Sequence, residues 1–442
     1  RIAQCCAGAV RLDIRDLRGR NFCIGKGGTD DGLLRRSIGG SQSAAGAIQT
    51  AALNFGTVQV GQSVSQNLTI RNTATGASGF VEDLNASFGS ASGTGAGLIS
   101  GSGSLNGILA GTNSTAGNGV MTVAVNTAAA GNVAGSIGVN YFTAGAVNGV
   151  SNGLGTAAAG SEAYGVNGLI QAAANVINQA NPVINNSSIN LGNVRIGSAS
   201  PSAFVSVTNQ ATIAPQAALN ASISGNALIT GSGSFNLLAP GATNSNSLQV
   251  GMDTSTAGAR NGTATISFVS DASNVGNCAP NCQLNIASQN VSVAGGVYRL
   301  ANAQNVTPSV TLAARVGDAA PSANVSITNQ SPDVFTEALK VQAGVAPSGF
   351  LVGSNPANIA AQGTGAVQVS LNTATAGTST GNLTLNHIST GAGTTNAADV
   401  SVGSSIVALT GKIYTAAVGA VQSAVNFGIV HVGDVVAAQG VS

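Results

Sequence analysis

The sequence predicts an all-β protein made of tandem immunoglobulin-like β-sandwich repeats. Short motifs recur in the same order about every 120 residues. Apolar and polar residues alternate within these motifs, as they do on a half-buried antiparallel strand, and clusters of Gly, Asn, Ser and Pro separate the alternating runs, as they do in turns. About seven such strands per unit match the size of an immunoglobulin-like sandwich. A parallel β-helix would show a repeat of about 20 residues, which the sequence lacks.

The composition excludes several classes of protein. Only 7% of the 442 residues are charged and the net charge is +1, so no basic surface is available for nucleic acid. The sequence has no run of about 18 apolar residues, the length that a transmembrane helix needs. Glycine is abundant (61 residues), tryptophan is absent and aromatic residues make up 3%. The apolar residues, 43% of the chain, are therefore mostly alanine, valine and other small aliphatic residues. Such side chains fill a thin core between two sheets.

Each unit opens with a strand that ends at a glycine. The motif is LNFGTVQVG at residues 53–61, INLGNVRIG at 189–197 and VNFGIVHVG at 425–433, with a degraded copy, VTLAARVG, ending at Gly317. We expect the closing glycines to adopt a positive φ or to allow a close approach. The position two residues before the closing glycine varies freely, and we expect it to face water. It is occupied by Gln59, Arg195, Arg315 and His431.

Further shared pieces follow in a constant order and complete each unit. They include LTIRN, VSVTN and VSITN; GSGSLNGILAG and GSGSFNLLAPG; and NTAAAG, DTSTAG and NTATAG. They predict repeat 1 at residues 50–175, repeat 2 at 176–302, repeat 3 at 303–418 and the truncated start of a fourth repeat at 419–442. Residues 171–179 alone have a helical texture. Residues 1–49 hold more than half of the 15 Lys and Arg residues, and we assign them to no repeat, as a disordered segment or the remnant of an upstream module.

The repeated motifs resemble those of bacterial "choice-of-anchor D" domain proteins, which are related to the ASPM–SPD-2–Hydin (ASH) group of immunoglobulin-like modules. The similarity rests on LNFGTVQVG with LTIRN, and on LAPG and DTSTAG with GTATISF, and extends over residues 50–442. Repeat 3 departs from the pattern because Leu312 stands at the glycine position of its first strand, which leaves the register of that strand open. The resemblance implies a secreted or cell-surface bacterial protein that is held by a C-terminal anchor and has no defined catalytic activity.

The residues that could carry acid–base chemistry are scattered. The two histidines, His387 and His431, lie in strand-like segments and outside any nucleophile motif, so we interpret both as structural. Glu82 and Asp83 are adjacent, and their counterparts Ala217, Ala218, Glu337 and Ala338 are mostly apolar, which favours a solvated loop over a shared acid–base site. Asp253 alternates with Asn126 and Asn372, as expected for an Asx-turn. We therefore predict no catalytic, cofactor-binding or metal-binding residues and no enzyme activity.

Two cysteines form a distinct local feature. Cys278 and Cys282 are spaced C-x3-C, which favours a small disulfide loop in an oxidising compartment over free thiols, and a metal site is least favoured because two cysteines supply too few ligands. Adjacent Cys5 and Cys6, with Cys23, fit no ordinary zinc spacing.

Three functions remain open from the sequence. A structural stalk or surface array at the cell surface is favoured, because identical units provide length. Adhesion or glycan binding through loops at the sandwich ends is second, because the tyrosines (Tyr141, Tyr164, Tyr298 and Tyr414) lie in or near strand-like segments. A cytoskeletal role by analogy with ASH modules is third. The expected partners are the neighbouring repeats, with surface or matrix glycans or proteins as further candidates and no cofactor or nucleic acid.

Overall fold

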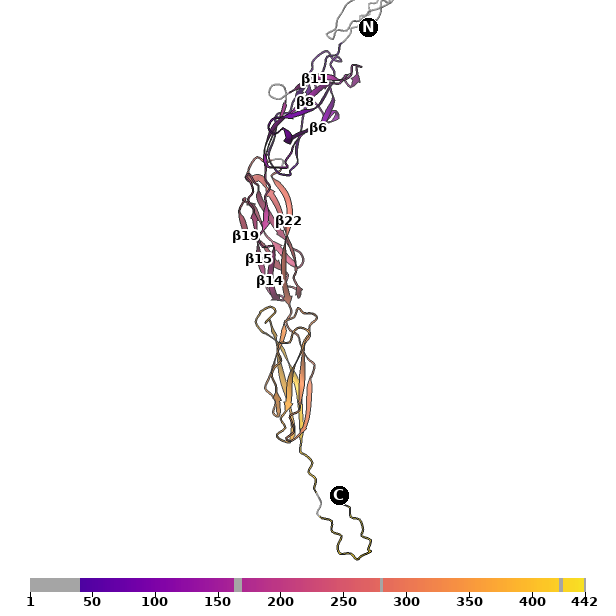
Figure 1. The fold of residues 1–442 in the computed structure, drawn as a ribbon, viewed down its shortest axis with the longest axis vertical. Coiled ribbons are helices and arrows are strands. Elements are labelled where there is room, and N and C mark those ends of the chain that lie inside the picture. Colours follow the sequence, from indigo (N-terminus) through magenta and orange to yellow (C-terminus); the bar gives the residue numbers. More distant parts are fainter. Residues whose placement is uncertain (1–39, 163–168, 279–280, 421–423, 441–442) are drawn as a thin grey trace, which may run out of the picture.

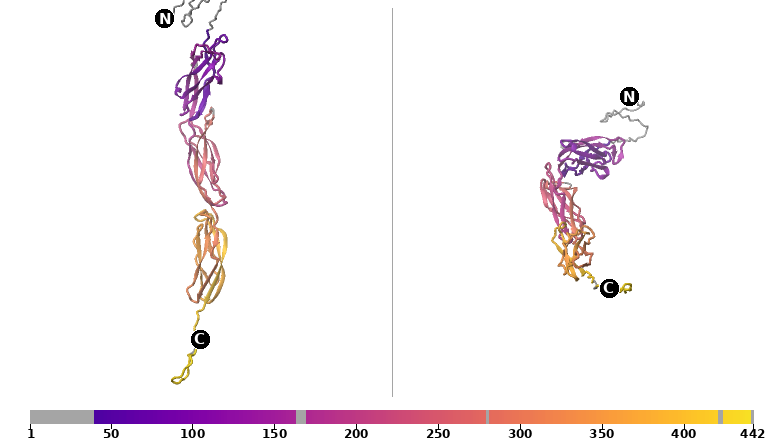
Figure 2. Two further views of the ribbon diagram at one scale, coloured as in Figure 1. Left: turned by 90° about the vertical axis from the view of Figure 1, so that its right-hand side faces the viewer. Right: turned by 60° about the horizontal axis from the view of Figure 1, so that its bottom comes forward.

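The computed structural model describes residues 40–162, 169–278, 281–420 and 424–440. Within them, three β-sandwiches follow one another end to end (Figures 1 and 2), and the right-hand view of Figure 2 shows the first sandwich tilted against the other two. Regular structure in the described residues consists of strands and three short 3-10 segments, η1 (Ala96–Leu98), η2 (Ala116–Asn118) and η3 (Ala272–Asn274). The predicted fold class, an all-β chain of tandem immunoglobulin-like sandwiches, is confirmed.

Repeats 2 and 3 each consist of two separate sheets. In repeat 2 the first sheet has the order β13-β15-β19-β17, and the second has the order β14-β22-β21-β16-β18 with β20 also on β22. The strands are β13 (Pro182–Ile184), β14 (Ser188–Arg195), β15 (Ser202–Asn209), β16 (Ala218–Ser224), β17 (Ile229–Ser232), β18 (Ser234–Leu238), β19 (Thr243–Met252), β20 (Gly258–Ala259), β21 (Gly262–Asp271) and β22 (Gln283–Tyr298).

Repeat 3 has the same layout with fewer strands. Its sheets have the orders β23-β25-β28-β27 and β24-β30-β29-β26. The strands are β23 (Ala303–Asn305), β24 (Ser309–Arg315), β25 (Ser322–Asn329), β26 (Ala338–Ala343), β27 (Phe350–Val352), β28 (Thr364–Leu371), β29 (Gly377–Thr390) and β30 (Val400–Tyr414).

In repeat 1 the two sheets are joined through one long strand, β6. The joined sheet has the order β2-β12-β8-β5-β6-β7-β3, with β11 also on β8, while β1 pairs with β4 and β9 with β10. The strands are β1 (Gly46–Ile48), β2 (Leu53–Gln59), β3 (Val64–Asn67), β4 (Ile70–Asn72), β5 (Leu84–Ser92), β6 (Ile99–Ile108), β7 (Gly119–Val125), β8 (Gly131–Thr143), β9 (Ala146–Val147), β10 (Val150–Ser151), β11 (Ala157–Glu162) and β12 (Leu169–Ile177).

The repeated GSGS motif marks the point where the chain passes from one sheet to the other. In repeat 1, β6 pairs with β7 from Ile99 to Leu105 and with β5 from Ser104 onward. In repeat 2 two strands on either side of Gly233 make these pairings: β17 pairs with β19 of one sheet and β18 with β16 of the other. Gly103 and Gly233 adopt φ values of 85° and 106°. A Cβ atom on either would lie within 2.0 Å of a backbone carbonyl oxygen, that of Val120 or Ser247. The motif therefore requires glycine at its third position.

The opening strand of each repeat pairs in parallel with the last strand of the same repeat, as β2 with β12, β14 with β22 and β24 with β30. In β2 and β14 a bulge interrupts this pairing at the Asn-x-Gly segment, where the Asn54 and Asn190 side chains accept hydrogen bonds from the Gly56 and Gly192 amides. Repeat 3 is one residue shorter here and pairs without interruption from Ser309 to Arg315. The lost residue is the extra residue of the bulge, which settles the register that the sequence left open.

A buried asparagine ends the second conserved segment of each repeat (LTIRN, VSVTN or VSITN). Asn72, Asn209 and Asn329 are fully buried, and each side-chain amide donates to two backbone carbonyls. One of these carbonyls belongs to Glu82, Ala217 and Glu337, respectively. These three residues are therefore structurally equivalent, as the order of the repeated motifs predicts.

The structure corrects two expectations about the repeat ends. Gly46–Ile48 forms β1 on β4, and Ala44 is buried in the core of repeat 1, so the assignment of residues 1–49 to no repeat is wrong for this part. Residues 1–39, with Cys5, Cys6 and Cys23, lie outside the described residues. Residues 169–177 form strand β12, not a helical segment, because pairing with β8 and β2 overrides the local alanine preference.

The junctions between repeats are short. The last strand of repeat 1 ends at Ile177 and β13 begins at Pro182; likewise β22 ends at Tyr298 and β23 begins at Ala303. Residues 178–181 and 299–302 thus connect the repeats. The described residues 424–440, which include the fourth copy of the opening motif, contain no strand.

Candidate functional site

Several buried polar side chains gather at the two junctions between repeats, among them Gln59, Ser270, Glu337 and Ser389. Each junction is built from the end of an opening strand in one repeat and from the loop between the last two long strands of the next. At the first junction the Thr57 amide donates to the Asn277 carbonyl (2.7 Å), and the connecting residue Asn178 forms a β-bridge with Gln216. At the second, Arg299 forms the equivalent bridge with Thr336. The same frame is therefore used twice.

The end of each opening strand is held in a defined turn. The closing glycines Gly61, Gly197 and Gly317 have φ values of 83°, 74° and 81°, as expected from the sequence. Their amides donate to the carbonyls of Thr127, Thr254 and Thr373 in the NTAAAG, DTSTAG and NTATAG motifs. The opening motif and the NTAAAG-type motif therefore recur together because they are hydrogen-bonded to each other in each repeat. The turn positions the residue two places earlier, which we call the plug residue: Gln59, Arg195, Arg315 and His431.

At the first junction the plug residue is Gln59, and it is completely buried. Its amide nitrogen donates to the carbonyl oxygens of Cys282 (2.8 Å) and Ser270 (3.1 Å) in repeat 2, and its amide oxygen accepts from the Ser270 hydroxyl. A small apolar cluster lies beside it. The cluster joins Ile177 of repeat 1 to Ala217, Ala272, Val275 and Cys278 of repeat 2.

At the second junction the plug residue is Arg195. Its guanidinium donates Nε to Glu337 Oε1 and Nη2 to Glu337 Oε2, both at 2.8 Å, and Nη2 also donates to the Ala398 carbonyl. The Glu337 side chain is 0% exposed and that of Arg195 16%. Nearby, the rings of Tyr298 and Phe335 lie 5.5 Å apart at a tilted angle. This is a two-pronged, largely buried ion pair between repeats.

The charge of Glu337 is maintained by its hydrogen bonds. Burial by itself would raise the pKa of Glu337, but the donors Arg195, Thr395 and Ser389 all stabilise the carboxylate, and together they hold its pKa below the ordinary value of 4.5. Ser389 donates to Glu337 Oε2 at 2.7 Å and Thr395 donates to Oε1. The pair is therefore ionised at neutral pH.

The expectation that the plug position faces water is wrong for Gln59 and Arg195. Each faces the next sandwich, and its partner depends on that sandwich. Glu337 binds Arg195, whereas the equivalent residue of repeat 2 is Ala217, which has no polar side chain, and Gln59 binds Ser270 and Cys282. We call Ala217 and Glu337, with their equivalent Glu82, the socket residues. A comparison of each repeat with the following one would have revealed this pairing, because Gln59 precedes Ala217 and Arg195 precedes Glu337. Arg315 and His431 are exposed.

The socket of repeat 1 is occupied by its own chain. Glu82 and Asp83 are 4% and 1% exposed, so the expectation of a solvated loop is wrong. Glu82 accepts from Ser41 (2.8 Å), Asn152 (2.5 Å) and Thr143, and these donors outweigh the effect of burial and lower its pKa. Asp83 accepts from the amides of Asn148 and Gly149. The two carboxylates hold the loop that carries β9 and β10, which is the counterpart of the junction loops in the other repeats.

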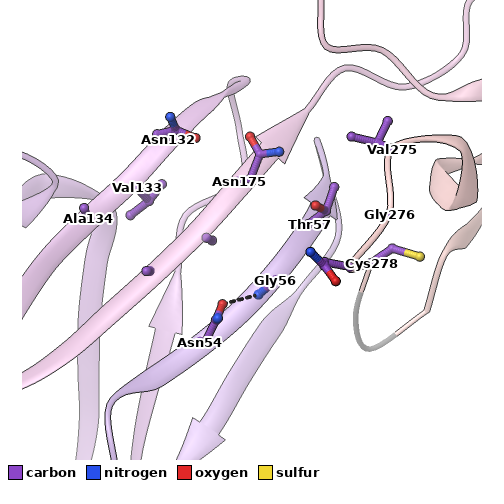
Figure 3. A pocket seen from close by; sticks show the side chains of 13 residues that line it. Asn54, Gly56, Thr57, Asn132, Val133, Ala134, Asn175, Val275, Gly276 and Cys278 are labelled. Atoms are coloured by element: carbon purple, nitrogen blue, oxygen red, sulfur yellow. Dashed lines mark hydrogen bonds between the residues drawn. The ribbon is translucent and has the colours of Figure 1, made fainter.

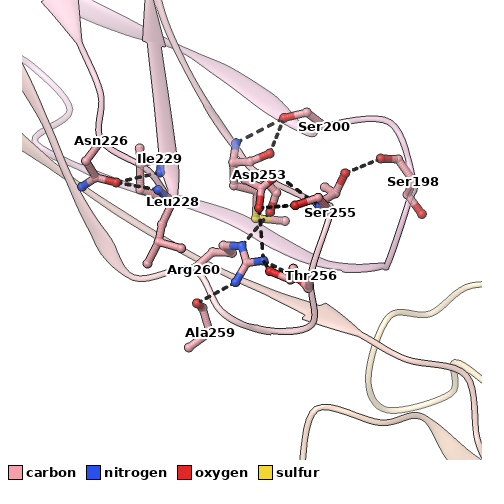
Figure 4. A network of polar contacts seen from close by, with 12 residues as sticks. Ser198, Ser200, Asn226, Leu228, Ile229, Asp253, Ser255, Thr256, Ala259 and Arg260 are labelled. Carbon is pink, nitrogen blue, oxygen red and sulfur yellow. Dashed lines mark hydrogen bonds and ion pairs between the residues drawn. The ribbon is translucent and has the colours of Figure 1, made fainter.

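A second polar network stabilises the loop at residues 253–260 of repeat 2 (Figure 4). The buried guanidinium of Arg260 donates to the carbonyls of Asp253 (2.6 Å) and Ala259 (3.2 Å), and to the carbonyl and hydroxyl oxygens of Thr256. The predicted Asx-turn is confirmed: the side chains of Asp253, Asn126 and Asn372 each accept from the amide two residues later. These contacts are internal to the loops.

The two histidines differ in their surroundings. His387 lies in β29, is 3% exposed and contacts the Ser405 hydroxyl through Nε2 (2.9 Å), while its Nδ1 has no partner among the described residues. Burial lowers the pKa of His387. His431 is fully exposed and lies 3.7 Å from Asp434. Within the part of the chain that the structure describes, no group of three or more His, Cys, Asp and Glu residues could hold a metal ion.

Cys278 and Cys282 lie in the loop of repeat 2 that receives Gln59. The structure places their sulfur atoms within bonding distance, with Cα atoms 5.0 Å apart, inside the usual range for a disulfide. Gln62 of repeat 1 donates to the Asn281 carbonyl within the same loop. The C-x3-C loop is thus one wall of the first junction.

A shallow groove of about 920 Å³ runs along this junction (Figure 3). Repeat 1 contributes residues such as Asn54, Thr57 and Asn175, and repeat 2 contributes Val275 and Cys278. The described residues that line it carry no charged side chain. No helix among the described residues is long and apolar enough to cross a membrane.

The chain is a tandem array of immunoglobulin-like sandwiches whose ends interlock. No known protein family and no curated protein matches its sequence. Among solved structures, it is similar to the I67–I69 fragment of the titin I-band (10% identity, 85% of this chain and 100% of that chain, TM-score 0.31). It is also similar to cadherin domains 1–5 of protocadherin gamma B2 (13%, 84% and 60%, 0.31) and to an ASH/PapD-like domain of human CEP192 (11%, 27% and 89%, 0.21). These TM-scores are too low to transfer a function.

Proposed function

We propose that the chain is a non-catalytic spacer of a secreted or cell-surface bacterial protein, in which the sandwiches hold other parts of the protein at a distance. The observation that carries this proposal is the burial of Gln59 and of the Arg195–Glu337 pair between successive repeats. Adjacent domains of one chain usually move relative to each other unless their interface is large and hydrophobic. The junctions here are polar, so their stiffness has to come from buried hydrogen bonds and the buried ion pair. These junctions are packed and hydrogen-bonded.

A buried polar junction resists bending for a physical reason. If repeats 2 and 3 separate on one side, Glu337 loses the bidentate donor that compensates its burial, and an unpaired buried charge is costly. At the first junction, bending would break the contacts of Gln59 with Ser270 and Cys282. The connecting residues 178–181 and 299–302 are too short to let the repeats move apart independently.

Small-angle X-ray scattering on the purified chain tests the spacer function. The longest strands of the three repeats, β8, β22 and β30, have 13, 16 and 15 residues, so a rod of three units end to end is on the order of 140 Å long at about 3.3 Å per strand residue. We expect the scattering of one stiff rod, unchanged by moderate salt because the contacts are buried. A broad ensemble of bent and compact shapes would contradict the proposal.

Adhesion through exposed loops is the second candidate. Tyr414 is 56% exposed at the end of repeat 3, and its strand partner is Arg315. Tyrosine is enriched at binding interfaces because its ring is apolar and its hydroxyl is polar. The equivalent residues Tyr298 and Arg195 lie in a junction, which favours the spacer. Binding of the chain to a glycan array, lost on Tyr414→Ala, would reverse the order of the two candidates.

A further inference from the structure

The two junctions have the same backbone contacts but different side chains at their centres. In both, a serine hydroxyl of the later repeat accepts a hydrogen bond from a backbone amide of the connecting segment. The Ala180 amide donates to Ser270 (2.8 Å) and the Ala301 amide donates to Ser389 (2.9 Å). In both, the same hydroxyl donates to an oxygen inside the junction. That oxygen belongs to the plug residue Gln59 at the first junction and to the socket residue Glu337 at the second.

The first junction is neutral throughout its centre. Gln59 supplies both a donor and an acceptor, and the carbonyls of Ser270 and Cys282 together with the Ser270 hydroxyl satisfy them. The socket residue Ala217 is fully buried and supplies only a methyl group. An arginine at position 59 would find no carboxylate at the socket position, and the buried carboxylate of Asp271, next to Ser270, is already bound by Asn220, Ser273 and Gln283.

The second junction is charged and balanced. Arg195 supplies two parallel donors to Glu337, whose oxygens also accept from Ser389 and Thr395. A glutamine at position 195 could not neutralise Glu337, which would then be a buried carboxylate without a counter-ion. Both mismatched combinations therefore destabilise the junction: an arginine plug facing an alanine socket, and a glutamine plug facing a glutamate socket.

We propose that the plug and socket residues form a matched pair that decides which repeat can dock onto which: Gln onto a socket with Ala, and Arg onto a socket with Glu. The inference rests on the proposed spacer function and adds an order to it, because each sandwich end accepts only a neighbour of complementary chemistry. This use of a mismatch to reject wrong partners is a general route to specificity.

Exchange of the two chemistries in the full chain tests the pairing. One set of variants is Arg195→Gln, Glu337→Ala and the double variant, which gives the second junction the chemistry of the first. The reciprocal set is Gln59→Arg, Ala217→Glu and their double variant. Hydrogen exchange of the peptides that contain Ala180 and Ala301 reports each junction separately, and peptides from the three cores report whether the sandwiches remain folded.

We expect Arg195→Gln to accelerate exchange of the Ala301 peptide about tenfold or more, because Glu337 is left buried and unpaired. The double variant Arg195→Gln/Glu337→Ala should recover most of the protection, and Gln59→Arg/Ala217→Glu should do the same at Ala180. If each double variant exchanges as fast as the product of its single variants predicts, the pairing does not exist.

The proposed spacer function is judged independently. Rod-like scattering of the unmodified chain together with additive double variants would overturn the pairing and leave the spacer standing. A flexible unmodified chain would overturn the spacer itself. A single variant that unfolds a sandwich is recognised by its core peptides, and the reciprocal set at the other junction then decides the pairing.

Discussion

Ser270 and Ser389 occupy the same position in successive sandwiches and perform the same double task. Each hydroxyl accepts a hydrogen bond from a backbone amide of the segment that connects its repeat to the previous one. Each also donates a hydrogen bond to the side-chain oxygen at the centre of the junction, which belongs to Gln59 for Ser270 and to Glu337 for Ser389. Both serines are completely buried. One hydroxyl at each junction therefore binds both the connecting backbone and the side chains that hold the two repeats together.

Replacement of this hydroxyl should weaken a junction without unfolding a sandwich. We expect Ser389→Ala to destabilise the second junction by about 1–3 kcal/mol, because the Ala301 amide loses its acceptor and Glu337 loses a donor. Hydrogen exchange at Ala301 measures the effect. Ser404→Ala, at an exposed position of β30 in the same repeat, is the control. Equal exchange in the two variants would show that Ser389 has no such role.

The sheet-switching glycine of repeat 1 should tolerate no side chain. Gly103→Ala places a Cβ atom within 2.0 Å of the Val120 carbonyl oxygen at a φ of 85°. We expect a loss of about 2–4 kcal/mol in the free energy of unfolding of repeat 1. Gly97→Ala, where a Cβ atom would meet nothing within 4 Å, is the matched control. Chemical denaturation of both variants gives the comparison, and a Gly103→Ala variant as stable as the control would contradict the strand crossing at this point.

The buried histidine should make repeat 3 sensitive to mild acid. Burial lowers the pKa of His387 below the ordinary value of 6.5, so the unfolded chain binds a proton more readily than the folded one. Stability should then fall as the pH drops below about 6.5 and stop falling once the pH passes the lowered pKa.

Thermal unfolding between pH 7.5 and pH 5 measures this dependence. His387→Gln should remove the slope in that window, whereas His431→Gln should keep it, since His431 is fully exposed. The prediction fails if the unmodified chain shows no slope that depends on His387.

Stronger acid should open the second junction before the first. The carboxylate of Glu337 has a pKa below 4.5, so its contribution is complete above that value and is lost as the pH falls through the lowered pKa. The groups that face it are Arg195, Ser389 and Thr395, and Asp399 lies close enough to interact with the Arg195 charge. Gln59 at the first junction does not titrate. Asp271, next to Ser270, has a pKa below its ordinary value of 3.8, and its donors Ser273, Gln283 and Asn220 all lie in repeat 2, so its protonation removes no contact between the repeats.

Hydrogen exchange, corrected for its intrinsic pH dependence, should therefore show Ala301 losing protection in acid before Ala180. The neutral double variant Arg195→Gln/Glu337→Ala serves as the control, because its second junction should no longer respond to pH in this range. Simultaneous opening of both junctions would assign the acid response to another group.

The end of repeat 3 should select the repeat that docks onto it. Arg315 pairs in the strand register with Tyr414 as Arg195 does with Tyr298, so it should require a socket with glutamate. In a chain where residues after Tyr414 are replaced by a second copy of residues 299–414, which carries Glu337, we expect a stiff four-unit rod. A copy of residues 178–298, which carries Ala217, should dock loosely.

Small-angle scattering of the two extended chains distinguishes these outcomes. Ala217→Glu in the loosely docked copy is the matched control and should restore stiffness. If both copies dock equally well, Arg315 does not select its neighbour.

Several features follow from local sequence patterns alone. Alternation along residues such as Val205 and Val207 predicts strands with one buried face, because side chains of a strand point alternately to its two sides. The turns at the closing glycines and the Asx-turns at Asn126, Asp253 and Asn372 are equally local, since they depend on the conformation of a few neighbouring residues. Recurrence of these patterns in one order was sufficient to predict the sandwich class.

The junctions could not be predicted in the same way. Gln59 and Arg195 stand on alternating strands where a polar residue normally meets water, and nothing within their own repeats marks them as buried. Their burial depends on Ser270 and Glu337, which lie 211 and 142 residues further along the chain. The end-to-end packing of two completed sandwiches brings these residues together and removes the water between them, so their function is decided by tertiary structure and not by the local pattern.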